Sequence, residues 1–385
     1  MRNPNTTAGL YIHFPFCTKR CSYCDFNVYA VPEIPQERYS KAILKEIRTR
    51  AHLLRGKEVV SVFLGGGTPS LWEPEWIGRT LQCIREEINL APDAEISMEM
   101  NPNECSEELM SQVHSMGVNR VSLGVQSLQG DLLRSMDRLH SPEQALQALE
   151  WLRKSNFRSW SADLIFGLPG QELSGWVNEL NTLLSTGVPH VSAYNLMVEP
   201  GTPLLQRLER GQVELPEESV QVAMLTEGRR ILRDAGFLAY EFSNFCQPGH
   251  ESVQNGIYWD GTDYLGIGAG AHGFLWTGES GVRQSNIRKF GSYMDAIERN
   301  GKAPDFQEEI DPHTHAIELL MTGLRRKTGV SLEVISRKTG MDVAAHWEAV
   351  FCELTEAGHL QQDGETLVLS EAAIPLSDGI FVKFF

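Results

Sequence analysis

The chain has 385 residues, 42% of them hydrophobic, and a formal net charge of −16 at pH 7. This length predicts one large domain with a smaller one, and the acidic excess argues against nucleic-acid binding, which needs a concentrated basic surface. No apolar run reaches the roughly 18 residues of a membrane helix, and the first residues lack the apolar core of a signal peptide, so we expect a cytoplasmic protein that is not integral to a membrane.

The first motif is a cysteine-rich loop that follows the strand-like run 10–14. It carries Cys17, Cys21 and Cys24 within eight residues. Three thiolates so close together are soft ligands for a metal or a cluster. The spacing offers no nearby fourth cysteine, which favours an iron-sulfur cluster with one open iron over a closed four-cysteine zinc site. Three reduced structural cysteines are the alternative.

The following two-thirds of the chain alternates short apolar runs with segments of helical periodicity. Strands are expected at 59–64, 94–100, 119–125, 158–166 and 189–196, and helices at 36–54, 73–88, 106–116, 142–155 and 172–186. With the run before the cysteines, this makes six strands separated by helices. The pattern predicts an α/β fold with a parallel sheet, either barrel-like or open and doubly wound, with functional residues at the carboxyl ends of the strands.

Glycine-rich and polar motifs stand at or near the ends of these strands. They are the segment Gly65–Pro69, Glu99, Gln126, Arg138 and Asp163. Glycines let backbone groups approach a ligand closely, and the Glu99 carboxylate can accept from ribose hydroxyls. Each motif alone has an ordinary explanation as a tight turn or a satisfied polar group. Their shared location predicts a ligand site.

Together these motifs resemble those of the radical S-adenosylmethionine (radical SAM) enzymes, and among them the group containing oxygen-independent coproporphyrinogen III oxidase and the HemW-type heme chaperones. The resemblance covers nearly the whole chain and implies a partial (β/α)6 barrel. It implies that the three cysteines hold a [4Fe-4S] cluster whose open iron binds S-adenosylmethionine. By the same resemblance, the residues that contact this cofactor are Tyr11, Gly67, Thr68, Glu99, Gln126, Arg138 and Asp163.

Two features favour the HemW-like branch over the oxidase. Phe26 stands where the oxidase has a further cysteine, and Tyr11 lies too close to the start of the chain for the oxidase's longer N-terminal extension. The HemW-like branch implies heme as a ligand, heme-accepting apoproteins as partners and an electron donor for the cluster. It argues against an authentic coproporphyrinogen III oxidase.

One motif departs from the HemW pattern. The family's His-Asn-x-x-Tyr-Trp segment begins here with Gln254, and glutamine is a poor iron ligand compared with imidazole. Cys246 and His250 lie upstream as replacement candidates and His272 lies downstream, but ordinary structural roles explain each of them as well. No heme ligand is therefore assigned. The glycine-rich stretch 263–272 is interpreted as tight packing near the site rather than a nucleotide-binding loop.

The expected domain organisation is a radical SAM barrel over 1–240, a linking segment packed near the site over 241–311, and a winged-helix-like domain over 312–385. This last part combines helical patterns with a hairpin at Asp363-Gly364. Its six basic residues against ten acidic ones favour a lid or packing role over DNA binding.

Three functions are consistent with the sequence. The first is a heme chaperone of the radical SAM fold. The second is an enzyme of the same fold that carries out oxidation or methyl transfer on a tetrapyrrole or another substrate, and the missing histidine makes it a serious alternative. The third, a zinc-stabilised interaction protein, does not account for the motifs at the strand ends.

Overall fold

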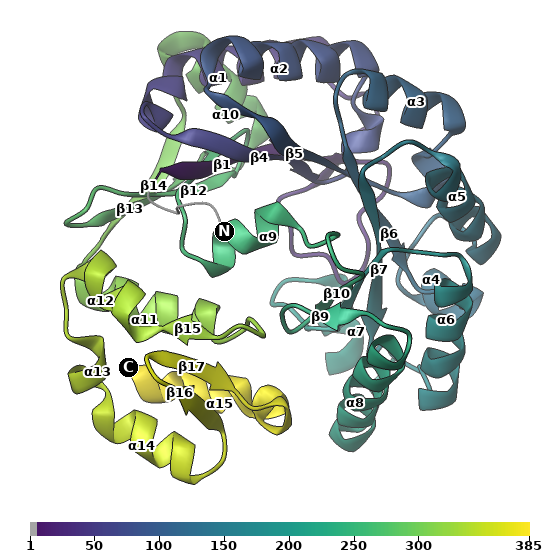
Figure 1. Cartoon of the computed structure of the whole chain (residues 1–385). Helices are drawn as coiled ribbons and strands as arrows, with labels where there is room; N and C mark the ends of the chain where they lie inside the picture. The colour runs from purple at the N-terminus through teal and green to yellow at the C-terminus, as the bar shows by residue number, and fades with distance from the viewer. Residues whose placement is uncertain (1–5) are drawn as a thin grey trace.

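A curved sheet of 12 strands forms the frame of the computed structural model, which describes residues 6–385 (Figure 1). Six strands in its centre run parallel to one another. They are β1 (Thr7–Phe14), β4 (Glu58–Gly66), β5 (Leu90–Met100), β6 (Arg120–Gln126), β7 (Ser159–Phe166) and β8 (His190–Asn195). These are the six strands expected from the sequence, so the α/β prediction is confirmed, with the sheet curved as in a partial barrel.

Helices cover the convex face of this sheet in the predicted alternation. They are α1 (Gln36–Arg50), α2 (Pro74–Glu87), α3 (Glu107–Ser115), α5 (Pro142–Lys154) and α6 (Leu173–Ser185), with the short α4 (Gly130–Ser135) between β6 and α5. The start of α5 shows why the chain turns into a helix at this point. Ser141 accepts a hydrogen bond from the backbone N–H of Gln144, the Gln144 side chain accepts one from the backbone N–H of Ser141, and Pro142 occupies the first turn.

Residues 241–311 extend the same sheet on both sides. On one side, β10 (Asn244–Cys246) pairs antiparallel with β8 and with the short β9 (Leu238–Ala239). On the other, β11 (Tyr264–Ile267) runs parallel to β1, and β12 (His272–Trp276), β13 (Gly281–Asn286) and β14 (Pro304–Ile310) continue antiparallel beyond it. These strands were not expected, because they lack a clear hydrophobic alternation.

The glycine-rich stretch 263–272 packs tightly, as the sequence predicted. A Cβ atom on Gly266 would lie 2.0 Å from the carbonyl oxygen of His272, and one on Gly268 would lie 2.5 Å from that of His13. Only glycine allows this close approach of backbone to backbone. The stretch therefore joins β11 to β12 without forming a phosphate-binding loop.

A buried carboxylate joins α1 to this extension of the sheet. Glu46 is fully buried, and its oxygens accept hydrogen bonds from Arg50 (2.7 Å), from the backbone N–H of Gly268 (3.0 Å), from Asn286 (2.7 Å) and from the hydroxyl of Tyr293 on α10 (Phe290–Asn300; 2.6 Å). A buried charge is tolerated only when it is paired and hydrogen-bonded in this way. The network holds four separate segments together.

The C-terminal part has its own hydrophobic core. Its elements are α11 (Pro312–Gly323), β15 (Val330–Ser331), α12 (Leu332–Thr339), α13 (Val343–His346), α14 (Glu348–Glu356), β16 (Leu360–Asp363), β17 (Thr366–Leu369) and α15 (Ser377–Phe381). The hairpin β16–β17 is present as expected, but its turn is Gly364-Glu365, one residue later than predicted, because Asp363 ends β16 and pairs with Thr366.

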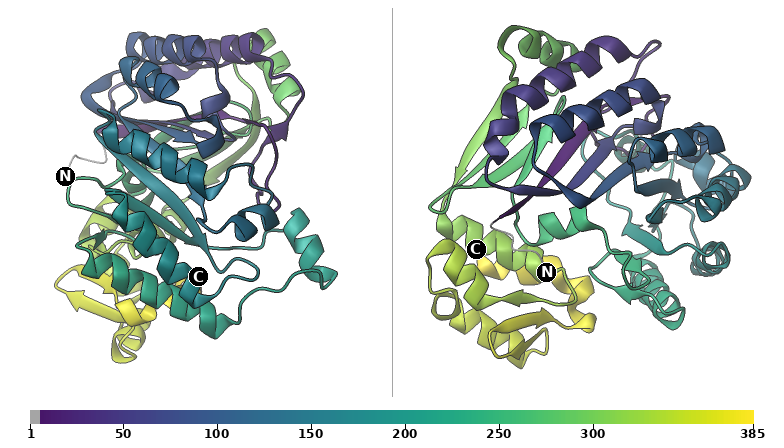
Figure 2. Two further views of the ribbon diagram at one scale, coloured as in Figure 1. Left: turned by 90° about the vertical axis from the view of Figure 1, so that its right-hand side faces the viewer. Right: turned by 45° about the horizontal axis from the view of Figure 1, so that its top comes forward.

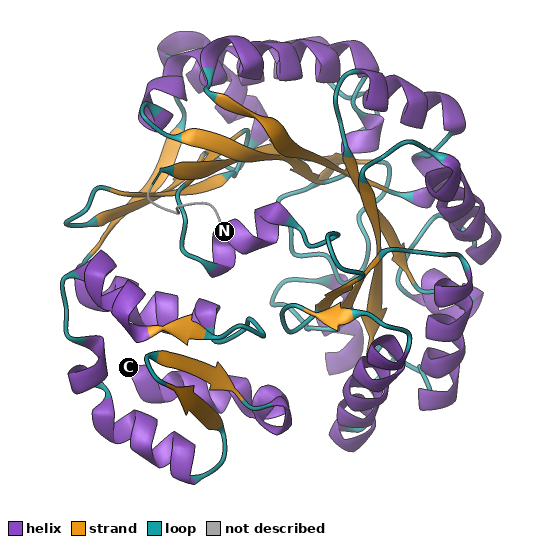
Figure 3. Cartoon of the chain, in the orientation of Figure 1, coloured by secondary structure: helices purple, strands orange, loops and turns teal. Residues whose placement is uncertain are grey.

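The C-terminal part packs at the amino ends of the barrel strands. Arg326 pairs with Asp260, and the Arg325 guanidinium lies over the ring of Trp259. In the left view of Figure 2, the yellow C-terminal part and the purple loop after β1 lie on opposite sides of the molecule. Figure 3 shows that the short strands of the C-terminal part are separate from the large sheet. This placement fits a packing role rather than a lid over the carboxyl ends.

No helix within residues 6–385 is long and apolar enough to cross a membrane.

Candidate cofactor site at the carboxyl ends of the strands

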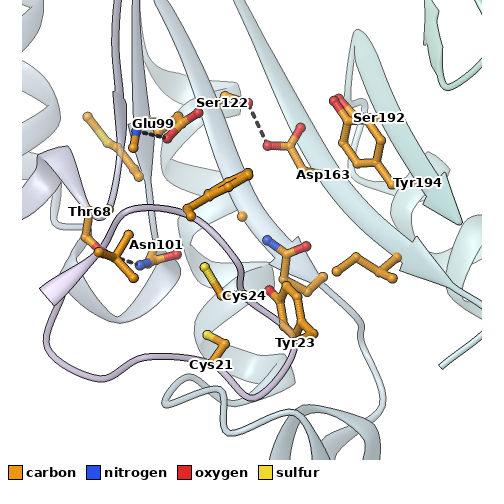
Figure 4. Close-up of a pocket in the computed structure, with 18 of the residues that line it drawn as sticks. Cys21, Tyr23, Cys24, Thr68, Glu99, Asn101, Ser122, Asp163, Ser192 and Tyr194 are labelled. Carbon is orange, nitrogen blue, oxygen red and sulfur yellow. Dashed lines mark hydrogen bonds between the residues drawn. The ribbon is translucent and has the colours of Figure 1, made fainter. Parts of the chain in front are cut away.

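A cavity of about 530 Å³ opens at the carboxyl ends of the barrel strands (Figure 4). Of the predicted site residues, those that line it are Cys17, Cys21, Cys24, Gly67, Thr68, Glu99, Gln126, Arg138 and Asp163. The parallel sheet explains this gathering, because the carboxyl ends of all six strands meet at the same edge. None of the described lining residues comes from 312–385.

The three cysteines lie on the loop that follows β1. Their thiols are free, and burial raises the pKa values of Cys17 and Cys24 to about 11, so a metal must displace a proton from each to bind. Nowhere in residues 6–385 do three potential ligands form the compact group that would hold a single metal ion. Three cysteines on one loop, with no fourth cysteine nearby in the sequence, suit a cluster with one open iron better than a closed four-cysteine zinc site.

A chain of hydrogen bonds connects two of these cysteines through the cavity wall. The Arg138 guanidinium donates to Cys21 Sγ (3.5 Å) and to Asn101 Oδ1 (2.7 Å). Asn101 in turn donates to Thr68 Oγ1 (2.9 Å), and the Thr68 hydroxyl donates to Cys17 Sγ (3.4 Å). These donors place positive charge and N–H groups where thiolates and a cluster would carry negative charge.

The glycine motif after β4 holds the cysteine loop in place. A Cβ atom on Gly67 would lie 2.6 Å from the carbonyl oxygen of Phe16, just before Cys17, and the Gly67 N–H donates to the carbonyl of Phe14 (2.8 Å). Gly66 adopts φ +113, and its N–H donates to Glu99 Oε2 (2.9 Å). The glycines thus allow close approach of the loop backbone, a structural reason for the motif that the sequence analysis did not identify.

Two carboxyl groups face the cavity from neighbouring parts of the sheet. Burial raises the pKa of Glu99 to about 7, and the negative charge of Asp163 adds a smaller increase. The hydrogen bond from the Gly66 N–H acts in the opposite direction and lowers this pKa. Burial also raises the pKa of Asp163, which accepts hydrogen bonds from Ser122 (2.6 Å) and Ser161 (3.2 Å). The site therefore holds one carboxyl group that changes charge near neutral pH and one supported by hydroxyl donors.

Several residues that line the cavity were not predicted from the sequence. Three serines on the adjacent strands β6, β7 and β8 face the cavity, namely Ser122, Ser161 and Ser192. In the register of the sheet, Ser122 lies beside Ser161, and Asp163 lies beside Ser192. A signal was present, since small polar residues recur at every second position of otherwise apolar strands. Asn101 also lines the cavity and follows Glu99 by two residues in the sequence.

Gln126 and Tyr11 differ in their relation to the cavity. Gln126 lines it and has φ +63, a left-handed conformation that is uncommon for a residue other than glycine and is concentrated at functional sites. Tyr11 lies within β1, stacks on Phe63 and forms a hydrogen bond with His13 Nδ1 (2.9 Å). Phe63 lines the cavity and Tyr11 lies behind it.

Comparison with known proteins agrees with this fold and site. The Radical SAM superfamily matches residues 11–183, and the HemN C-terminal domain matches residues 310–376. The structure of HemN, the coproporphyrinogen III oxidase of Escherichia coli, superposes with a TM-score of 0.85 at 24% identity, covering 100% of this chain and 91% of HemN. That likeness concerns the fold.

Sequence relatives extend over nearly the whole chain. The heme chaperone HemW of Bacillus subtilis is 32% identical, covering 97% of this chain and 98% of that protein. The bovine radical S-adenosyl methionine domain-containing protein 1, mitochondrial, is 34% identical, and the match covers 94% of this chain and 82% of that protein. The chain is thus a radical SAM protein. Within that superfamily it belongs to the HemW family, and this membership implies a [4Fe-4S] cluster and S-adenosylmethionine as its cofactors.

Proposed function

We propose that this protein is a heme chaperone of the radical SAM fold, which binds heme and passes it to apoproteins. Relatives named heme chaperone HemW, from Bacillus subtilis and Lactococcus lactis, match it over 98% of their own lengths and support the proposal. The observation that carries it is the loop with three cysteines and Phe26, all bordering one cavity, where the oxidase motif would require a fourth cysteine. A cytoplasmic location is part of the same proposal.

The proposed roles of the residues follow from their chemistry. Cys17, Cys21 and Cys24 would hold the cluster as thiolates, with Arg138 offsetting negative charge beside them. S-adenosylmethionine carries an amino group, a carboxylate and a ribose, which suit a set of carboxylates, backbone groups and a guanidinium. That set is Tyr11, Gly67, Thr68, Glu99, Gln126, Arg138 and Asp163, with Tyr11 acting through Phe63. A reduced cluster can supply one electron to the sulfonium, and an external electron donor is a proposed partner.

The raised pKa of Glu99 predicts how S-adenosylmethionine binding depends on pH. The ionised carboxylate accepts hydrogen bonds with both oxygens and carries a negative charge, whereas the protonated acid is neutral and turns one oxygen into a donor. Affinity should therefore be full above the pKa of about 7 and should fall as the pH drops through 7. The Glu99→Gln variant should bind S-adenosylmethionine at least about tenfold more weakly at pH 8, and its affinity should depend little on pH. Anaerobic titration calorimetry at pH 6 and pH 8 measures both effects.

An exposed carboxylate supplies the control for this experiment. Glu75→Gln on α2 removes a glutamate that only pairs with Arg79 at the surface, and it should leave affinity and pH dependence unchanged. Equal affinity of the unmodified protein at pH 6 and pH 8 would contradict the role given to Glu99.

Heme titration tests the function itself. The cluster-loaded protein should bind heme with one-to-one stoichiometry, followed by its Soret absorbance, and should release it to an apo-hemoprotein faster than free solution exchange. S-adenosylmethionine cleavage is assayed in parallel. If no heme binds and 5'-deoxyadenosine forms rapidly, the protein is instead a radical SAM enzyme acting on another substrate.

A further inference from the structure

The residue that replaces the family histidine lies far inside the protein. Gln254 belongs to α9 (Val253–Trp259) and has an exposed fraction of 1%. Its Oε1 lies 3.3 Å from the position of a Cβ on Gly9, near the start of β1, and the N–H of Val253 donates to Glu95 Oε1 on β5 (2.9 Å). Position 254 therefore sits near the amino ends of the strands, packed against β1, and its side chain is not part of the cavity lining, although Ser252 and Asn255 are.

The opposite end of the barrel has an apolar surface of the kind that a porphyrin needs. Among the described residues, the large hydrophobic side chains that are both exposed and in the cavity lining are Phe26, Tyr194 and Met197. Phe26 is 60% exposed and follows the third cysteine, whereas Met197 is 70% exposed and lies on the loop after β8. We call these three residues the rim. Large exposed apolar side chains grouped at a cavity are typical of ligand sites.

The rim is accompanied by positive charge from the cysteine loop. Lys19 and Arg20 both line the cavity, and both are exposed. Lys19 pairs with Asp137 at the surface (2.7 Å), and the Arg20 guanidinium donates to the carbonyl of Cys24 (2.8 Å). Such solvent-exposed pairs are weak and leave donor capacity for another anion. Arg120 and Arg138 line the cavity as well but are buried and half-buried, so Lys19 and Arg20 are its exposed cations, with Asp25 and Glu199 also in the lining.

We propose that heme docks at the rim, with its porphyrin face on Phe26, Tyr194 and Met197 and its propionates directed to Lys19 and Arg20. This inference rests on the proposed function and gives it a location. Heme has a flat apolar face and two carboxylates at one edge, which match an apolar surface with two cations beside it. Phe26 and Met197 stand on loops at the carboxyl ends of the strands, and Tyr194 lines the cavity wall beside Ser192 (Figure 4), so heme bound at the rim lies next to the proposed cofactor residues.

The other exposed apolar residues give no comparable surface. None of them is in the cavity lining; they are Leu53, Leu139, Val222, Leu238, Phe306, Val334, Leu376, Val382 and Phe385. Single exposed apolar side chains are normal on soluble proteins. Two of them, Leu376 and Val382, are 54% and 68% exposed, which matches Phe26 and Met197 closely enough for a control.

The test compares two double variants of the cluster-loaded, S-adenosylmethionine-bound protein. Phe26→Ser with Met197→Ser should weaken heme binding about tenfold or more, whereas Leu376→Ser with Val382→Ser should bind heme like the unmodified protein. Visible absorbance of the cluster reports that each variant is folded and loaded. If the unmodified protein binds heme and the first double variant binds it equally well, the rim proposal is overturned while the heme chaperone proposal stands.

A second comparison tests the charges. Lys19→Ala with Arg20→Ala should weaken binding of heme several-fold but should not change binding of heme dimethyl ester, whose propionates are blocked. An equal loss for both ligands would overturn the contact with the propionates. If the unmodified protein binds neither ligand, the heme chaperone proposal fails and the rim proposal fails with it.

Discussion

Replacement of Cys21 by serine is expected to abolish the [4Fe-4S] cluster. Cys21 is one of three thiols on the loop after β1 and accepts the hydrogen bond from Arg138 that begins the chain through Asn101 and Thr68 to Cys17. A serine hydroxyl is a hard, weakly acidic ligand that binds iron poorly compared with a thiolate. After anaerobic reconstitution, the variant should lack the broad visible absorbance of the cluster, and its iron and sulfide contents should fall close to zero.

Two other cysteines serve as controls. Cys352 is exposed on α14, and Cys105 lies close to the site, where its thiol donates to the carbonyl of Asn101 (3.2 Å), a bond that a serine hydroxyl can reproduce. Serine at either position should leave the iron content unchanged. A full cluster in the Cys21 variant, or loss of the cluster in the Cys352 variant, would show that the loop is not the cluster site.

Much of the fold was predictable because it is encoded locally. The buried strands appear as continuous apolar runs, the helices show 3.6-residue periodicity, and Ser141 with Pro142 marks the start of α5. The cysteine loop and the strand-end motifs were predictable as well, because a parallel sheet brings its carboxyl ends to one edge. Local pattern and topology together therefore located the cavity.

Other features depend on contacts between distant segments. The strands β12 to β14 are stable only because β11 pairs with β1, about 250 residues earlier in the chain, and their own patterns are weak. The close packing of Gly67 against Phe16 and the burial of Gln254 follow from the same long-range assembly. None of these contacts leaves a periodic signal in the sequence.

Glu46 is the clearest such case. In the sequence, Glu46 is a charged residue of an amphipathic helix, where a solvated carboxylate would be expected. Arg50 follows it at the i+4 spacing that is typical of an ordinary surface ion pair. Its other partners, Gly268, Asn286 and Tyr293, lie more than 200 residues away. Only the folded sheet reveals that the pair is buried.

Replacement of Glu46 by alanine should therefore destabilise the barrel by about 3–5 kcal/mol, because it leaves the buried Arg50 cation without its carboxylate and three other donors without this acceptor. Urea unfolding followed by circular dichroism, with the anaerobic cluster-loaded protein at pH 7, measures the free energy of unfolding.

The matched control lies on the same helix. Glu37 is exposed and pairs with Lys41 at the same i+4 spacing (2.6 Å), so Glu37→Ala removes an equivalent carboxylate without burying a charge and should leave unfolding unchanged within error. If Glu46→Ala lowers the free energy of unfolding no more than Glu37→Ala does, solvent reaches Arg50 and the hydrogen-bond network around Glu46 contributes little to stability. A large loss at Glu46 alone would show that α1 is held to the extended side of the sheet by this one carboxylate, through contacts that its position in the sequence does not reveal.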